Sequence, residues 1–135
     1  MTAAIDTRRL YSFEDSDEYF PWLDDLQPMH VLRRLAWRIW EECPTGRCWS
    51  RPSLSAGRGT RHGPRLTSFT EGNRITLVPR QRTRRILIHE MVHVIGPVGH
   101  GSAFVECYVR LLVRYGRQQE DLLRLRMATI AGVRA

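Results

Sequence analysis

Apolar residues recur at the spacing of an α-helix in four segments of the chain. In residues 29–42 the apolar side chains fall three and four positions apart, which predicts a helix with one buried face. The same spacing predicts helices over residues 103–115, with Ser102 as the N-cap, and over residues 118–127. Residues 82–95 are apolar on nearly every side, so we expect that helix to be buried in the core.

Between the predicted helices over residues 29–42 and 82–95, the chain shows short β-rich runs, punctuated by Gly, Ser, Thr and Pro. We predict strands over residues 51–56, 65–70 and 74–78, and an exposed loop over residues 57–63. The last two strands form a hairpin, because a three-residue break that contains Gly72 is a hairpin signal. The order of elements predicts an α+β domain with an N-terminal helix, a small, mostly antiparallel three-stranded sheet, and C-terminal helices.

Charge divides the chain into an acidic arm and a basic body. Residues 1–28 hold seven acidic residues and two arginines, a net charge of −5. Residues 29–135 hold seven acidic residues and 19 arginines, a net charge of +12. We therefore expect an arm that either lies against the body or is a partly ordered leader, followed by one folded domain.

A body this basic favours DNA or another polyanion as a partner, with an ordinary solvated surface as the alternative. The best candidate contacts are Arg110, Arg114 and Arg117, which are spaced along one predicted helix face. Binding that weakens as salt rises is the expected signature of such a surface.

Other compositional features predict a cytoplasmic protein, which we expect to be a monomer. No apolar stretch approaches the ~18 residues that span a bilayer, so no membrane contact is expected. The first 20 residues are too acidic for a signal peptide. Cys43, Cys48 and Cys107 form no even disulfide framework, which suits a reducing compartment. Cys43 and Cys48 alone are too few for a structural zinc site, and Cys107 is expected to be a small core residue.

The candidate chemistry lies in the sequence HEMVH at residues 89–93. His89 and His93 leave the same face of the predicted helix one turn apart, so both imidazoles can bind one Zn²⁺ at ~2.0–2.1 Å. Glu90 lies beside that metal and can take a proton from a zinc-bound water that attacks a peptide carbonyl. Metal ligation also removes the cost of several kcal/mol that unpaired polar groups have in a buried helix.

A catalytic zinc site has three protein ligands and one open position. The best third candidate is His100, seven residues beyond His93, because the intervening glycine- and proline-containing turn can bring the chain back. His30 and His62 are the competing histidines, and Glu106 is the competing acid.

The run HEMVH at residues 89–93, a short turn, and then HGSAF at residues 100–104 resemble the SprT-like (Spartan-type) metallopeptidases. The signature of that family is HExxH, a variable spacer and HGxxF, and residues 72–79 are similar to its strand before the active helix. The resemblance implies a zincin-like minimal fold, one zinc ion bound by His89, His93 and His100, and Glu90 as general base.

The same resemblance implies a zinc-dependent endopeptidase whose substrate is a protein or peptide. The best-known members of the family cut proteins crosslinked to DNA, which suggests DNA-associated or unfolded protein as the substrate. We expect a minimal form here, because no cysteine-rich zinc ribbon follows residue 116.

The metzincin pattern HExxHxxGxxH fits less well. Gly96 matches its glycine, but Gly99 occupies the position of the third ligand and His100 arrives one residue late. The HGxxF continuation therefore favours the SprT-like family. Tyr108 and Arg110 are the candidates for stabilising the oxyanion of the transition state.

Two alternatives to the peptidase are open at this point. One is a non-catalytic module, stabilised by zinc, that binds nucleic acid or another partner. The other is a basic nucleic-acid-binding protein in which the HEMVH sequence is accidental and no metal is bound.

Overall fold

The computed structural model describes residues 21–43, 50–57, 60–62, 65–96 and 99–131. The described helices are α2 (Pro21–Asp24), α3 (Met29–Glu42), the 3₁₀ turn η2 (Pro79–Gln81), α4 (Arg84–Ile95), α5 (Ser102–Tyr115) and α6 (Glu120–Ala131). The strands are β1 (Ser53–Ala56), β2 (Thr60–His62), β3 (Arg65–Thr67), β4 (Phe69–Glu71) and β5 (Arg74–Leu77). The fold is α+β, as the sequence predicts.

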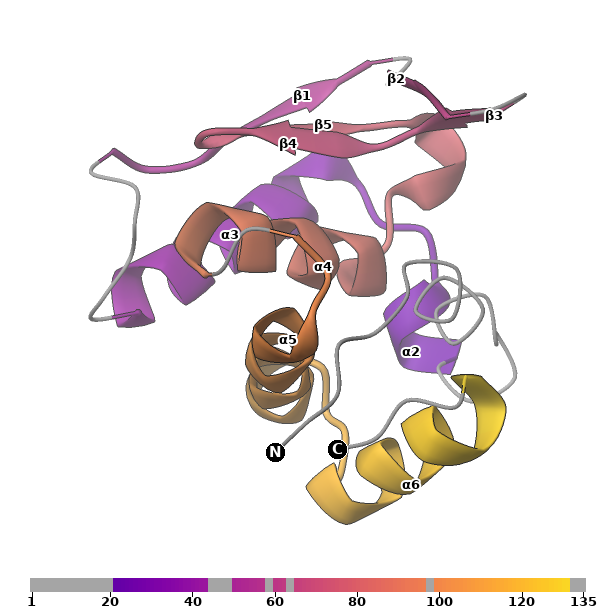
Figure 1. Ribbon diagram of the computed structural model, residues 1–135. Coiled ribbons are helices and arrows are strands. Elements are labelled where there is room, and N and C mark those ends of the chain that lie inside the picture. The colour runs from indigo at the N-terminus through magenta and orange to yellow at the C-terminus, as the bar shows by residue number, and fades with distance from the viewer. Residues whose placement is uncertain (1–20, 44–49, 58–59, 63–64, 97–98, 132–135) are drawn as a thin grey trace.

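The sheet forms one layer, and the helices lie on one side of it (Figure 1). Helices α3 and α4 lie directly beneath the sheet, through contacts of α3 with β1 and of α4 with β4. On its other sides α4 contacts α2 and α5, and α6 packs on α5. Helix α4 is therefore central in the molecule, which explains why its sequence is apolar on nearly every side.

All four predicted helices are present, with small shifts at their ends. Helix α4 begins two residues later than predicted, because the hydroxyl oxygen of Thr83 accepts a hydrogen bond from the backbone N–H of Ile86 and caps it. The prediction that Ser102 is the cap of α5 is wrong. Ser102 is the first helical residue, and Gly101 precedes it without a side-chain cap.

The three-stranded sheet has the order β1-β5-β4. Strand β5 pairs antiparallel with β4 but parallel with β1, so the sheet is mixed and the prediction of a mostly antiparallel sheet is wrong. The physical reason is the length of chain between β1 and β5. It contains three further strands and can carry the chain back to run in the original direction, as a parallel pair requires.

The predicted strand over residues 65–70 is two strands, β3 and β4, that separate at Ser68. The backbone N–H of Ser68 donates to the side chain of Gln81, and its hydroxyl oxygen accepts from the N–H of Val78. The prediction of an exposed loop over residues 57–63 is wrong for β2, which pairs antiparallel with β3.

The hairpin between β4 and β5 is present, with a tighter turn than predicted. Glu71 pairs with Arg74, so the loop is only Gly72 and Asn73. Gly72 has a φ of +61°, the left-handed value that glycine adopts without strain at the first central position of such a turn.

One hydrophobic core joins the sheet to the helices. Buried side chains of β5 meet those of α3 and α4 on one side, and α5 adds Phe104, Tyr108 and Leu112 on the other. From the acidic arm, Leu23 is fully buried in the same core. No helix among the described residues is long and apolar enough to cross a membrane.

The described end of the arm, residues 21–28, lies against α4. Asp24 forms an ion pair with Arg85, and both side chains are largely buried. Arg84 donates to the backbone oxygen of Trp22 and lies over its indole ring, 3.9 Å from the ring centre. Residues 1–20 of the predicted arm lie outside the described part of the chain.

Candidate metal centre

Helix α4 carries His89 and His93 one turn apart on the face that meets α5. The His89 side chain is nearly enclosed, with 6% of the residue exposed, whereas His93 is half-buried. A spacing of four residues brings the two rings to a centroid distance of 5.2 Å. One nitrogen of each ring can therefore reach a common point beside the helix.

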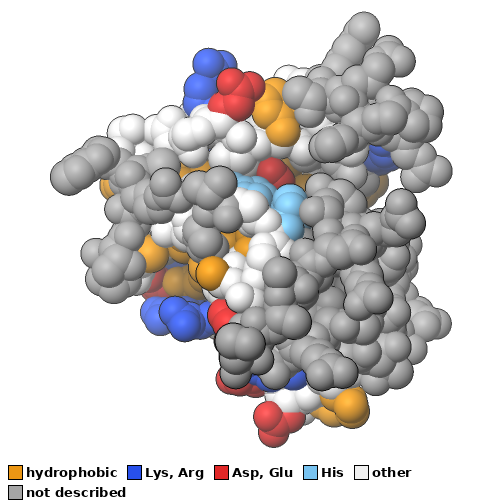
Figure 2. All heavy atoms as spheres, in the orientation of Figure 1, with side chains coloured by type: hydrophobic (Ala, Val, Ile, Leu, Met, Phe, Trp, Pro, Cys, Tyr) orange, Lys and Arg blue, Asp and Glu red, His pale blue; other side chains and the backbone are white. Residues whose placement is uncertain are grey.

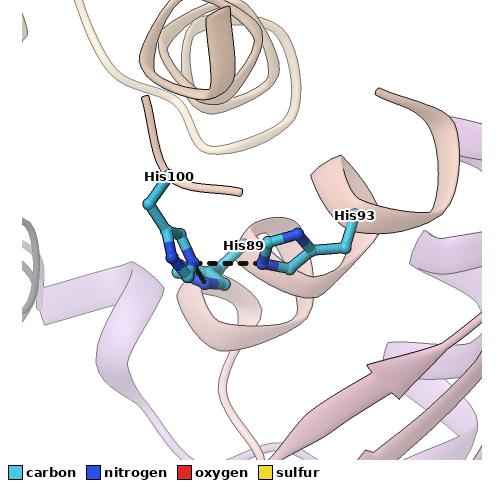
Figure 3. Close-up of side chains that lie close together, drawn as sticks. All are labelled: His89, His93 and His100. Atoms are coloured by element: carbon cyan, nitrogen blue, oxygen red, sulfur yellow. Dashed lines mark hydrogen bonds between the residues drawn. The ribbon is translucent and has the colours of Figure 1, made fainter. Parts of the chain in front are cut away.

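His100 returns to the same point from the turn between α4 and α5. Gly96 ends α4, and its N–H donates to the backbone oxygen of Val92. Gly99, directly before His100, has a φ of +82°, a left-handed conformation that glycine adopts at little cost. The Nε2 atom of His100 lies 3.1 Å from Nε2 of His89 and 3.1 Å from Nε2 of His93 (Figure 3).

These three histidines lie close enough to bind one metal ion. Two Nε2 atoms bound at ~2.0–2.1 Å to one tetrahedral zinc ion would be about 3.3 Å apart, close to the observed distances. The contacts also fit a metal better than hydrogen bonds. Nε2 of His100 carries either one proton or one lone pair, so it cannot form a good N–H···N bond to both neighbours. A cation accepts the lone pairs of all three nitrogens together.

Phe104 forms the wall behind the three imidazoles. Its ring centre lies 4.8 Å from that of His89, 5.0 Å from that of His93 and 4.8 Å from that of His100, and its side chain is fully buried. The phenylalanine of the HGSAF sequence therefore fixes the orientation of all three rings by packing. Histidine side chains are visible near the middle of the face in Figure 2, next to an acidic side chain.

Glu90 points to the sheet side of the metal centre. The residue is 6% exposed, and its carboxylate Oε1 accepts a hydrogen bond of 3.0 Å from the hydroxyl of Thr70 on β4. We did not identify Thr70 from the sequence. The available signal was strand alternation, because Thr70 pairs with the buried Ile75 and so faces the helices with it.

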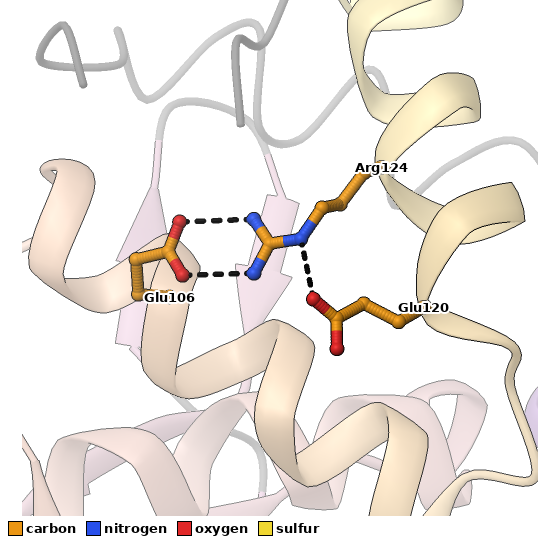
Figure 4. A network of polar contacts seen from close by, with 3 residues as sticks. All are labelled: Glu106, Glu120 and Arg124. Carbon is orange, nitrogen blue, oxygen red and sulfur yellow. Dashed lines mark hydrogen bonds and ion pairs between the residues drawn. The ribbon is translucent and has the colours of Figure 1, made fainter. Parts of the chain in front are cut away.

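The competing ligands lie elsewhere, as far as the described residues show. His30 is exposed at the start of α3 and does not belong to the histidine group. His62 lies on β2, and its side chain is outside the described part of the structure. Glu106 binds both terminal nitrogens of Arg124 at 2.9 Å, and Arg124 also contacts Glu120 (Figure 4).

The Glu106–Arg124 pair joins α5 to α6 and gives a prediction about stability. Hydrogen bonds from Arg124 lower the pKa of Glu106, so the folded state favours the ionised carboxylate. Its contribution is present above the unfolded pKa of about 4.3 and is lost as the pH falls through the lower folded pKa. We expect Glu106→Gln to lower the free energy of unfolding by about 1 kcal/mol or less at pH 7, because the pair is partly exposed.

Denaturant unfolding of wild type and Glu106→Gln, from pH 7 down to pH 3, measures this difference. The two proteins should converge at the acid end. Glu41→Gln is the matched control, since Glu41 is exposed and has no ion pair among the described residues. A difference between wild type and Glu106→Gln that persists unchanged at pH 3 would contradict the assignment.

The three candidate DNA-contacting arginines do not share one helix face. Arg110 and Arg114 are exposed on α5, and Arg114 is 3.4 Å from the carboxylate of Glu42. Arg117 lies beyond the end of α5, with a φ of +57°, and its guanidinium carbon is 4.1 Å from the ring centre of Trp22. The predicted shared face therefore holds only for Arg110 and Arg114.

The two candidates for stabilising the oxyanion, Tyr108 and Arg110, differ in exposure. Tyr108 is fully buried, with its ring 5.7 Å from that of His89, whereas Arg110 faces solvent.

Cys107 is half-buried on α5, and burial raises the pKa of its thiol, so it is not an activated nucleophile. Cys43 is also half-buried, and Cys48 lies outside the described residues.

Comparisons with models of known protein families, with curated proteins and with solved structures found no match for this chain. The functional assignment therefore depends on the residues and geometry of the site.

Proposed function

We propose that this protein is a zinc-dependent endopeptidase of the SprT-like type. The single observation that carries the proposal is the convergence of three histidine Nε2 atoms, from His89, His93 and His100, beside the helix that carries the buried Glu90. Imidazole nitrogens are favourable ligands for zinc. Three protein ligands with one open position are typical of catalytic zinc sites.

A zinc ion held by these nitrogens would supply a Lewis acid, which lowers the pKa of bound water from 15.7 to roughly 7 and polarises a carbonyl oxygen. The three histidines would hold the ion through the lone pairs of neutral rings, and Phe104 packs against all three rings. His89 and His93 come from the buried helix α4, whereas His100 comes from the turn before α5, two residues before that helix begins.

Glu90 is the general base of the proposed reaction. A carboxylate oxygen takes a proton from the water molecule that attacks the peptide carbonyl carbon. The same oxygen then returns the proton to the leaving amine nitrogen as the C–N bond breaks, so Glu90 ends each cycle ionised. Glu90 is buried and directly follows the ligand candidate His89 in α4, which supports this role.

The non-catalytic alternative accounts for less of the site. A structural zinc site is closed by four ligands, whereas the ligand group among the described residues has three histidines. A purely structural ion also gives no reason for a buried carboxylate next to one of its ligands, since burying a charge is costly. The catalytic assignment explains both features.

Nucleic-acid binding is the second candidate function, and it is compatible with the first. The observation that favours it is the net charge of +12 on residues 29–135. Near the end of α5, Arg84 and Arg117 both lie against the indole of Trp22, and aromatic and arginine side chains together are common on surfaces that bind single-stranded DNA. The proposed substrate is therefore an unfolded or DNA-associated protein.

The test is cleavage of a reduced, alkylated and therefore unfolded protein by the zinc-loaded chain. We expect new fragments, loss of cleavage on chelation, and recovery when zinc is restored. A parallel reaction with single-stranded DNA measures whether DNA accelerates cleavage. If the chain with stoichiometric zinc cuts neither the unfolded protein nor itself, with or without DNA, the peptidase proposal fails.

A further inference from the structure

Strand β4, at the edge of the three-stranded sheet, presents the hydroxyl of Thr70 to the HEMVH helix. In the register of the sheet, Thr70 is directly opposite Ile75, so both side chains point to the same face. Ile75 is fully buried on that face, beneath which α4 lies. The alternation of the strand thus places a polar group where the neighbouring residues of the core are apolar.

The oxygen of that hydroxyl has two close neighbours on the helix. It is 3.0 Å from Oε1 of Glu90 and 3.4 Å from the backbone oxygen of the same residue. An ionised carboxylate can only accept hydrogen bonds, so the threonine must be the donor. The shorter contact and the negative charge of the acceptor both favour the bond to the carboxylate, because charge-assisted hydrogen bonds are the stronger kind.

We propose that Thr70 is a positioning residue, whose hydrogen bond to Oε1 fixes the orientation of the Glu90 carboxylate for the proton transfer described above. This inference rests on the proposed function. The terminal torsion of a glutamate side chain is broad, so packing on its own leaves the carboxylate plane poorly fixed. A bond from the rigid sheet removes that freedom, and catalytic groups lose much of their effect when they are misplaced by about 1 Å.

The test compares Thr70→Val, which keeps the shape and removes the hydroxyl, with Thr70→Ser, which keeps the hydroxyl. We expect Thr70→Val to lower kcat by about 10–100-fold, the range seen when a partner that orients an active-site group is lost. KM and zinc content should stay near wild type. Thr70→Ser should recover most of kcat, an outcome that a purely structural role would not give.

Thr76→Val is the matched control. Thr76 lies on the adjacent strand β5, next to Ile75 and on the opposite face, where its hydroxyl is 3.2 Å from that of Ser55. Thr76→Val removes the same hydroxyl group from the same sheet without touching Glu90, so the kcat of this variant should equal that of wild type. An equal loss of kcat in Thr70→Val and Thr76→Val would overturn the proposal.

A measurement that needs no turnover tests the contact itself. In a double-mutant cycle on the full chain with its metal, Thr70→Val and Glu90→Met are combined and the unfolding equilibrium constant is measured. We expect the change in that constant on Thr70→Val to be about 2–10 times larger in the wild-type background than in the Glu90→Met background. Additive effects would show that the hydrogen bond does not form and would overturn the proposal.

The failures of the two proposals are distinguishable. If Glu90→Gln is inactive and Thr70→Val retains full kcat, the positioning role of Thr70 is wrong and the peptidase stands. If wild type cleaves nothing, or if Glu90→Gln cleaves as fast as wild type, the proposed reaction is wrong and the role of Thr70 falls with it.

Discussion

Replacing Glu90 with glutamine is expected to reduce peptide-bond cleavage by about 10²–10⁴-fold, the usual contribution of a general base. The amide has nearly the shape of the carboxylate, and its oxygen can still accept the hydrogen bond from Thr70. It cannot take a proton from water at neutral pH. The rate of cleavage of an unfolded protein, measured at equal zinc content, checks this result.

Two further measurements on Glu90→Gln separate the candidate functions. Zinc content and thermal unfolding should match wild type, because the histidine nitrogens and Phe104 are untouched. Glu106→Gln is the control for loss of one acidic residue on a neighbouring helix, and its cleavage rate should be normal. Should Glu90→Gln retain full cleavage activity, Glu90 would not be the base, and a structural role for the metal would become the better account.

The parts of the fold that local sequence determines were predicted well. The three-and-four spacing of apolar residues located α3 and α5, and the surplus of apolar residues located the buried helix α4. The relative positions of His89 and His93 depend only on the period of one helix, and the position of His100 depends on a turn of a few residues. Their convergence could be predicted because no distant part of the chain is needed to bring them together.

The mispredicted strand pairing and the missed contact of Thr70 both depend on contacts between distant segments. The parallel pairing of β1 with β5 joins residues about 20 positions apart, and no residue in either strand encodes the direction of its neighbour. The contact between Thr70 and Glu90 also spans 20 positions, across two elements of different type. Arg117 was assigned to one helix face with Arg110 and Arg114, although it lies beyond Tyr115, where the helix was predicted to end and where α5 does end.

The second large effect is expected for His100→Ala, which should abolish stoichiometric zinc binding. Two histidines would remain where a catalytic site has three protein ligands. We expect the affinity for zinc to fall by more than about 100-fold, which exceeds the loss when a residue that only hydrogen-bonds to a ligand is removed. Metal analysis of the dialysed protein measures zinc per chain. The rise of Tm on adding zinc, which follows from binding to the folded state, should disappear in parallel.

His30→Ala is the matched control, because it removes the same side chain from an exposed position at the start of α3. Its zinc content and its thermal response to zinc should equal those of wild type. If His100→Ala retained one zinc per chain, then the 3.1 Å contacts of His100 with the other two histidines would have a different cause. The third ligand would then have to come from elsewhere, and Glu106 is an unfavourable source because Arg124 binds both of its carboxylate oxygens. Zinc content of these two variants therefore decides whether the HGSAF sequence completes the metal site.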